Sequence, residues 1–247
     1  AKDSPNKKKT MSNKSSMLAQ LGMVRNILLR AILVLIVIFI GLTFFQDLIY
    51  LKISEPLIQF LPKDSSMIAT GVASPFLTPL KLTFYSAIFF ALPYLVIEFW
   101  NFISPGLYKK EKILYVSLTL ISVLLFYAGM TFAFYVVFPL IFNFFIQAAP
   151  EGVMVMTDIS NYLDFIIKLF FAFGLAFEMP IIIFALVWSG MVTTEKLANG
   201  RPYVIIGCFV VGMLLTPPDI VSQTLLAVPT WFLFEIGLLA TKVFIRN

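Results

Sequence analysis

Long stretches without a charged side chain constrain this sequence more than any other feature. No residue from Ile113 to Pro150 is charged, and the stretches Ala31–Gln46 and Leu82–Ile97 are uncharged as well. Hydrophobic residues make up 60% of the chain and charged residues only 13%, whereas soluble domains carry about 25% charged residues. A water-soluble domain of 247 residues could not bury so much apolar surface. The sequence therefore predicts an all-α integral membrane protein.

The uncharged stretches and the polar turns between them predict six membrane-spanning helices in a single domain, residues 17–247. A single helix over Ile113–Pro150 would overshoot a bilayer of about 30 Å, so we expect the third span to end near Pro139 and Leu140–Asp164 to form an outer loop with short helices. Prolines within spans favour kinked helices, and kinked helices of unequal length favour a curved wall with a concave face. The expected spans are residues 27–49, 77–99, 113–139, 165–188, 203–215 and 225–243.

The cations predict the orientation of these spans. Residues 1–16 are rich in Ser, Asn and Lys, which predicts a disordered basic tail beside an anionic membrane surface. Fourteen of the 18 Lys and Arg residues lie in the tail, at the start of the first helix, in the two charged turns or at the C-terminal end. The positive-inside rule then places both termini in the cytoplasm.

Several classes of chemistry are excluded or disfavoured by composition. The chain has no His, so it cannot use imidazole catalysis or His-ligated metals. Its one cysteine, Cys208, lies in an apolar stretch and is expected to be a small packing residue. The sequence has no phosphate-binding loop of the GxxxxGK[ST] type. We expect no metal, no cofactor and no enzymatic activity.

Five charged residues fall within the expected spans and are the candidates for function, because a charge in lipid needs a partner, water or a cavity. Glu178 is the deepest, and either it faces a water-accessible surface or it is a structural carboxylate that is paired or protonated. Snorkelling explains those near span ends, including Lys168, which is expected about one turn from the outer end. The five are Lys81, Glu98, Lys168, Glu178 and Glu235.

One acid, Glu111, lies among three lysines in the turn Lys109–Lys112. Such a residue is usually solvated without a partner. Its functional alternative is a carboxylate that binds an arginine of an incoming ligand through a bidentate, charge-assisted pair.

Several of these segments together resemble TatC, the multispanning core subunit of the twin-arginine protein translocase. The resemblance covers about residues 25–244 and is most specific in the last two of the sequence motifs given next. These motifs are Ser66–Thr70 with Val72–Phe76, Ser104–Tyr108, Leu125–Met130, Phe171–Pro180 and Val210–Asp219.

The resemblance implies a receptor and scaffold in the bacterial inner membrane. In that family, the cytoplasmic face binds twin-arginine signal peptides of folded cargo, the single-span subunits TatA and TatB assemble against the spans, and the proton-motive force drives transport. By position, Glu111 matches the signal-binding glutamate, and Glu178 matches an intramembrane glutamate of the concave face with Gln223 near it. The other matched residues are Phe102, Pro105, Leu107, Tyr108 and Arg25 for signal binding, and Pro56 and Asp219 in outer loops.

The chain departs from the family before its first span. Where the family has a second signal-binding glutamate, this chain has Met23, and Gln20 replaces a histidine. The loss of one charge-assisted bond, worth about 1.5–3 kcal/mol, predicts weaker or altered recognition, or compensation by another acid.

Two other classes of function stay open from the residues alone. A secondary transporter or proton channel could use Lys168, Glu178 and Glu235 as a relay, although no inverted repeat is visible. An intramembrane enzyme would need a nucleophile and a base, and no such pair stands out.

Overall fold

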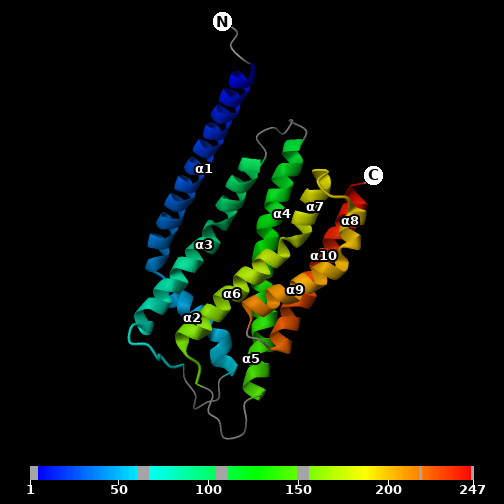
Figure 1. Ribbon diagram of the computed structural model, residues 1–247. Helices are drawn as coiled ribbons and strands as arrows, with labels where there is room; N and C mark the ends of the chain where they lie inside the picture. Colours follow the sequence, from blue (N-terminus) through cyan, green and yellow to red (C-terminus); the bar gives the residue numbers. More distant parts are fainter. Residues whose placement is uncertain (1–4, 61–66, 104–110, 149–155, 217–218, 246–247) are drawn as a thin grey trace.

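The chain folds into a bundle of α-helices in the computed structural model, which describes residues 5–60, 67–103, 111–148, 156–216 and 219–245 (Figure 1). Side chains are described for residues 22–56, 58–59, 67–98, 116–148, 156–216 and 219–245. Within these ranges the only β-pairing is an isolated bridge between Ile68 and Asp158. The all-α architecture expected from the sequence is confirmed.

The helices follow one another with short connections. Their bounds are α1 Pro5–Thr43, α2 Gln46–Phe60, α3 Ser74–Ile103, α4 Glu111–Phe132, a π-helical segment Ala133–Val137, α5 Phe138–Gln147, α6 Ile159–Phe177, α7 Met179–Trp188, α8 Thr194–Asn199, α9 Arg201–Leu215 and α10 Ile220–Phe244. Five segments in the described part are long and apolar enough to cross a membrane: Gly22–Thr43, Ser74–Glu98, Val116–Gln147, Ile159–Trp188 and Ile220–Phe244. The remaining expected span, residues 203–215, corresponds to α9, a shorter apolar helix.

The start of the chain differs from expectation. Residues Pro5–Thr43 form one helix, although the composition of residues 1–16 predicts disorder. The side chains before Gly22 lie outside the described part. α1 ends at Thr43 and a turn at Phe44 and Phe45 leads into α2, so the expected end of this span at residue 49 is wrong.

The expected end of the third span near Pro139 is also wrong. The helical path continues through Pro139 to Gln147, because the π-helical segment lies directly before the proline. The N–H of Phe138 bonds to the carbonyl of Ala133, five residues back, and this wider turn accommodates a residue that has no N–H of its own. The fourth span begins earlier than expected, at Ile159 rather than 165, so the connection between them is short.

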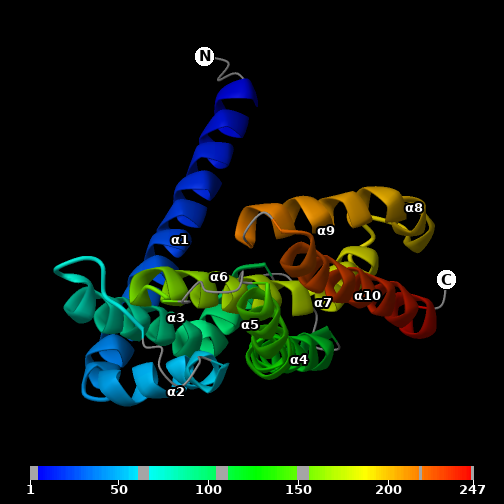
Figure 2. The same cartoon turned by 90° about the horizontal axis from the view of Figure 1, so that it is seen from below.

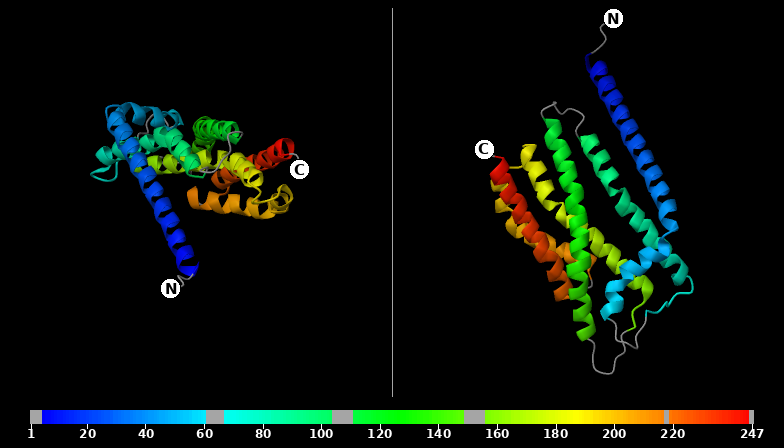
Figure 3. Two further views of the ribbon diagram at one scale, coloured as in Figure 1. Left: turned by 90° about the horizontal axis from the view of Figure 1, so that it is seen from above. Right: turned by 180° about the vertical axis from the view of Figure 1, so that it is seen from behind.

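The helices pack in a defined order. α1 packs on α3, α4 on α6, and α10 on both α7 and α9. Viewed along the bundle, α6 lies between α4 on one side and α9 on the other, and α1 projects away on the side of α9 (Figures 2 and 3).

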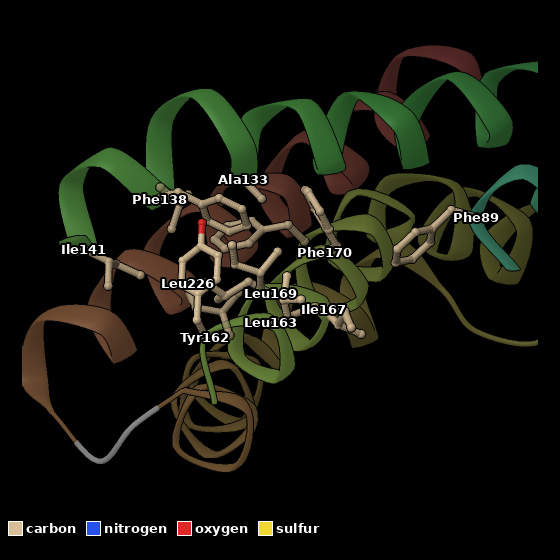
Figure 4. Packing of buried hydrophobic residues seen from close by; sticks show 14 of the residues in the cluster. Phe89, Ala133, Phe138, Ile141, Tyr162, Leu163, Ile167, Leu169, Phe170 and Leu226 are labelled. Atoms are coloured by element: carbon tan, nitrogen blue, oxygen red, sulfur yellow. The ribbon is translucent and has the colours of Figure 1, made fainter. Parts of the chain in front are cut away.

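An aromatic-rich core holds the centre of the bundle together. Figure 4 shows Phe138 of α5 against Phe170 of α6, whose ring centroids are 5.2 Å apart. Phe126, Phe138 and Phe173 are almost completely buried. This core fixes α6 in the middle of the bundle; α6 carries Asp164 and Lys168 and ends directly before Glu178.

Candidate functional site

The residues singled out in the sequence fall at two ends of the bundle and at one point within it. The end of α3, the start of α4, the N-terminal half of α1 and the end of α10 lie at one end (Figure 1). The starts of α3, α6 and α10 lie toward the other. The first of these ends, which carries most of the cations, is called the cation-rich end below, and the second the opposite end.

Glu111 is the first residue of α4, at the cation-rich end. Phe102 lies in the last turn of α3, so eight residues separate it from the start of α4. The side chains of Glu111 and Phe102 lie outside the described residues, as do Pro105, Leu107 and Tyr108 entirely. Their predicted role therefore stays a prediction.

Arg25 lies on the exposed surface of α1, where its Nη2 is 3.5 Å from Oδ1 of Asn26. Met23, at the position of the missing second acid, is 46% exposed on the same helix. Both side chains are free to meet a ligand at this end of the bundle.

The structure identifies Glu98 as a second acid toward the cation-rich end. Oε1 of Glu98, in α3, accepts a hydrogen bond of 2.7 Å from the hydroxyl of Tyr94 and lies 3.8 Å from Nη1 of Arg30. Arg30 follows Met23 by two helical turns on α1, so both lie on the same face of α1. Only snorkelling was expected of Glu98 from the sequence, because the contact between α1 and α3 depends on tertiary packing.

Glu178 lies at the break between α6 and α7. The break is dictated locally by Pro180, which lacks an N–H and whose ring clashes with the carbonyl four residues back in a regular helix. Oε2 of Glu178 accepts a hydrogen bond of 2.7 Å from Ser122 of α4. Oε1 is buried and has no hydrogen-bond partner among the described residues.

Close packing of α4 on α6 sets the distance between Ser122 and Glu178. A Cβ on Gly129 would collide with the backbone carbonyl of Phe173, and a Cβ on Gly174 would lie 2.5 Å from the ring of Phe126. These two glycines therefore let the antiparallel helices approach until the Ser122 hydroxyl reaches the carboxylate.

Glu235 and Lys168 are not assembled with Glu178. Glu235 of α10 is held by both Nε and Nη2 of Arg201, at 2.7 and 2.9 Å. Lys168 precedes Glu178 by ten residues on α6, or about 15 Å along the axis. The relay of a transporter is therefore not formed by these three residues.

Gln223 does not lie beside Glu178, in contrast to the expectation. Its Nε2 donates to the carbonyl of Phe209 in α9 at 2.8 Å. Gly237 is the residue of α10 that packs on Pro180, and it lies fourteen residues, or about 21 Å, beyond Gln223. Gln223 instead joins α9 to α10.

The opposite end of the bundle is stabilised by a carboxylate that sequence reasoning missed. Oδ1 of Asp158 caps α6 by accepting from the backbone N–H groups of Ser160 and Asn161. Its Oδ2 accepts from both the N–H and the hydroxyl of Thr70. These hydrogen bonds lower the pKa of Asp158 to about 2. An Asp directly before an apolar helical stretch is the signal that could have found it.

The two expected outer-loop residues have structural surroundings. Pro56 is buried within α2, so it belongs to a helix rather than to a loop. Asp219 caps α10 by accepting from the N–H of Ser222 at 2.7 Å. Cys208 is buried, in agreement with its expected packing role.

No group of three or more Cys, Asp or Glu side chains that could hold a metal ion occurs in the described part of the chain. Among the described carboxylates, Glu98 accepts from the hydroxyl of Tyr94 and Glu178 from the hydroxyl of Ser122.

Comparison with known proteins decides the family. A family model described as Sec-independent protein translocase protein (TatC) matches residues 19–229. The protein of Azotobacter chroococcum mcd 1 named Sec-independent protein translocase protein TatC is 56% identical over 221 residues, which cover 90% of this chain and 87% of that protein. The chain belongs to the TatC family.

Other relatives agree. The TatC protein of Escherichia coli strain K12 is 52% identical over 90% of this chain and 86% of its own length. A crystal structure titled "Crystal Structure of Twin Arginine Translocase Receptor- TatC" superposes with a TM-score of 0.81 at 30% identity, over 92% of this chain and 100% of that one. This TatC protein is therefore a multi-pass membrane component of a protein translocase and not an enzyme.

Proposed function

We propose that this TatC protein is the twin-arginine signal-peptide receptor and scaffold of a translocase that exports folded proteins across the bacterial inner membrane by means of the proton-motive force. The observation that carries the proposal is the acidic residue Glu111 at the first position of α4, in a chain whose structural relative is titled a twin-arginine translocase receptor. A guanidinium pair on the signal peptide is the chemical complement of such a carboxylate.

The orientation follows from the charges. The ends of α3 and α10 and the start of α4 lie together with the N-terminal half of α1, and this end carries most of the cations. The positive-inside rule places it in the cytoplasm, with six spans once α9 is included. Folded cargo with its signal peptide would then meet Glu111 from the cytoplasmic side.

The partners follow from exposed apolar helix surface. α1 exposes large aliphatic side chains along its length, among them Leu29, Leu33 and Val37. Lipid and the single transmembrane helices of TatA and TatB can both cover such a surface, because packing in lipid depends on shape rather than on hydrophobicity. We expect assembly into a hetero-complex that also contains further copies of this chain.

Photocrosslinking from position 111 to matched signal peptides tests the receptor role. We expect a twin-arginine peptide to be labelled more strongly than its twin-lysine counterpart, because only the guanidinium forms a bidentate pair. The same probe placed at position 196, on exposed α8, serves as the control for nonspecific labelling. Equal labelling of the two peptides at position 111 would contradict the proposal.

A further inference from the structure

Lys168 occupies a position that the family role does not explain. α6 begins at Ile159, so Lys168 lies nine residues, or about 13.5 Å, inside the helix, and not one turn from its end as the sequence suggested. Its side chain is exposed, and no hydrogen bond or ion pair to it is found among the described residues. A lysine at such a depth in a membrane-spanning segment requires a partner.

The neighbours of Lys168 leave a net positive charge. Asp164 lies one helical turn earlier on the same face of α6 and forms an ion pair with Lys81 of α3. Lys168 follows Asp164 by one turn but forms no described ion pair with it, since Asp164 pairs with Lys81; Lys81 and Asp164 are 46% and 42% exposed. Two cations and one carboxylate therefore follow one another on this side of α3 and α6.

Two cavities meet at Lys81, near the starts of α3 and α6. One, of about 440 Å³, is lined in part by the polar side chains of Thr78, Lys81, Ser160 and Asp164. The second, of about 400 Å³, is lined by apolar side chains of α1 and α3, including Phe39, Leu80 and Phe84. Leu77 and Lys81 belong to both cavities, so the space at the helix ends, with its few polar side chains, adjoins an open apolar groove farther along α3.

We propose that these cavities bind one anionic phospholipid. Its phosphate lies at Lys81, within reach of Lys168, which itself lines neither cavity, and its acyl chain fills the groove along Phe39, Leu80 and Phe84. The order of the two spaces matches the order of a lipid, with the headgroup at the membrane surface and the chain directed inward. The excess cation supplies the charge complementarity for the phosphate. A transmembrane helix with its own carboxylate is the competing occupant. It would not need the polar cavity at the helix ends.

Lipid binding to the purified full-length protein tests the site. Native mass spectrometry would count the phosphatidylglycerol molecules that stay bound to the wild type and to Lys168→Gln during a titration in detergent. Loss of one charge-assisted contact predicts about tenfold weaker binding for Lys168→Gln. Lys168→Arg should bind like the wild type, as should Lys196→Gln, which removes an exposed lysine of α8 at the cation-rich end.

The two halves of the site can be separated. Leu80→Trp fills the groove that holds the acyl chain, so this variant should bind phosphatidylglycerol more weakly than the wild type does. It should gain no affinity for glycerol 3-phosphate, which has the headgroup chemistry but no acyl chain. Helical circular dichroism and a single elution peak would establish that each variant is folded. Equal retention of phosphatidylglycerol by Lys168→Gln and the wild type overturns the proposal. A photocrosslinker at position 168 that labels a single-span subunit in membranes, and not lipid, also overturns it.

Discussion

The described carboxylates of this TatC protein differ in what holds them, and that difference separates structural from functional residues. Glu235 is neutralised by the fork of Arg201, and Asp164 by Lys81. Glu178 has only the hydroxyl of Ser122 on one oxygen, and its other oxygen is buried without a described partner. A carboxylate held this loosely at a helix break is suited to receive a donor from a bound helix or peptide.

Glu98 is the described acid best placed to substitute for the missing glutamate at position 23. We predict that Glu98→Gln lowers photocrosslinking of a twin-arginine peptide from position 111 about tenfold or more, because a charge-assisted bond is worth about 1.5–3 kcal/mol. Met23→Glu should restore capture in the Glu98→Gln background. The measurement is the crosslinked fraction at fixed peptide concentration, with Glu55→Gln as a control acid in α2 at the opposite end. Unchanged capture by Glu98→Gln would remove this residue from the binding site.

Asp158 gives a prediction with a pH dependence. Its folded-state pKa of about 2 lies below the ordinary value of 3.8, so its stabilising effect is present above about pH 4 and is lost as the pH falls through 2. We predict that Asp158→Asn lowers the thermal unfolding midpoint at pH 7, because an amide cannot accept from Thr70 and from the helix start as strongly as a carboxylate does. The difference from the wild type should shrink as the pH approaches 2. A difference that stays constant down to pH 2 would mean that the carboxylate charge does not contribute.

At the scale of helices, close approach between α4 and α6 positions Glu178. Gly129→Ala would place a methyl group against the carbonyl of Phe173. We predict a loss of about 1–3 kcal/mol in the free energy of unfolding, since overpacking forces backbone shifts. Gly207→Ala in α9 is the matched control, because no atom lies within 4 Å of its added Cβ. That change should leave stability equal or raise it by up to about 1 kcal/mol through helix propensity. Unfolding followed by circular dichroism in detergent would compare the two, and equal stabilities would show that the helices tolerate a wider spacing.

Which helices exist was predictable from hydropathy, whereas several of their ends were not. An uncharged stretch of twenty residues favours a membrane helix whatever its neighbours are. The helix continues through Pro139 because of the π-helical segment Ala133–Val137, and no sequence pattern predicts such a segment. The misplaced start of α6 followed from that error, and it made Lys168 look closer to the membrane surface than it is.

The candidate site was predictable only in part for a related reason. The types and positions of Glu111 and Glu178 were visible in the sequence, because a lone acid in a basic turn and an acid in lipid are both unusual. Their partners were not, because Ser122 is 56 residues away from Glu178 in the chain. The same holds for Arg30 and Glu98, which meet only through the packing of α1 on α3.

At the scale of the whole molecule, the orientation can be tested with the single cysteine. In a Cys208→Ser background, new cysteines would be introduced one at a time and labelled in intact cells with a membrane-impermeant maleimide. We expect positions 13, 111 and 196 to stay unlabelled and positions 64 and 152 to react, since the positive-inside rule places the first three in the cytoplasm. Labelling of position 111 from outside would reverse the topology and exclude the proposed receptor role.

The exposure of α1 has a consequence for how the protein is made. No residue in the most apolar 18-residue window of Gly22–Thr43 is buried inside the bundle, so this helix gains little from the segments that follow it. It can leave the insertion machinery for lipid while the ribosome is still translating the rest. The Glu178 segment cannot do so until α4 is beside it, because its carboxylate has no donor in lipid. Biosynthesis should therefore proceed with an early, independent first helix and a later step in which α4 and α6 enter the bilayer together.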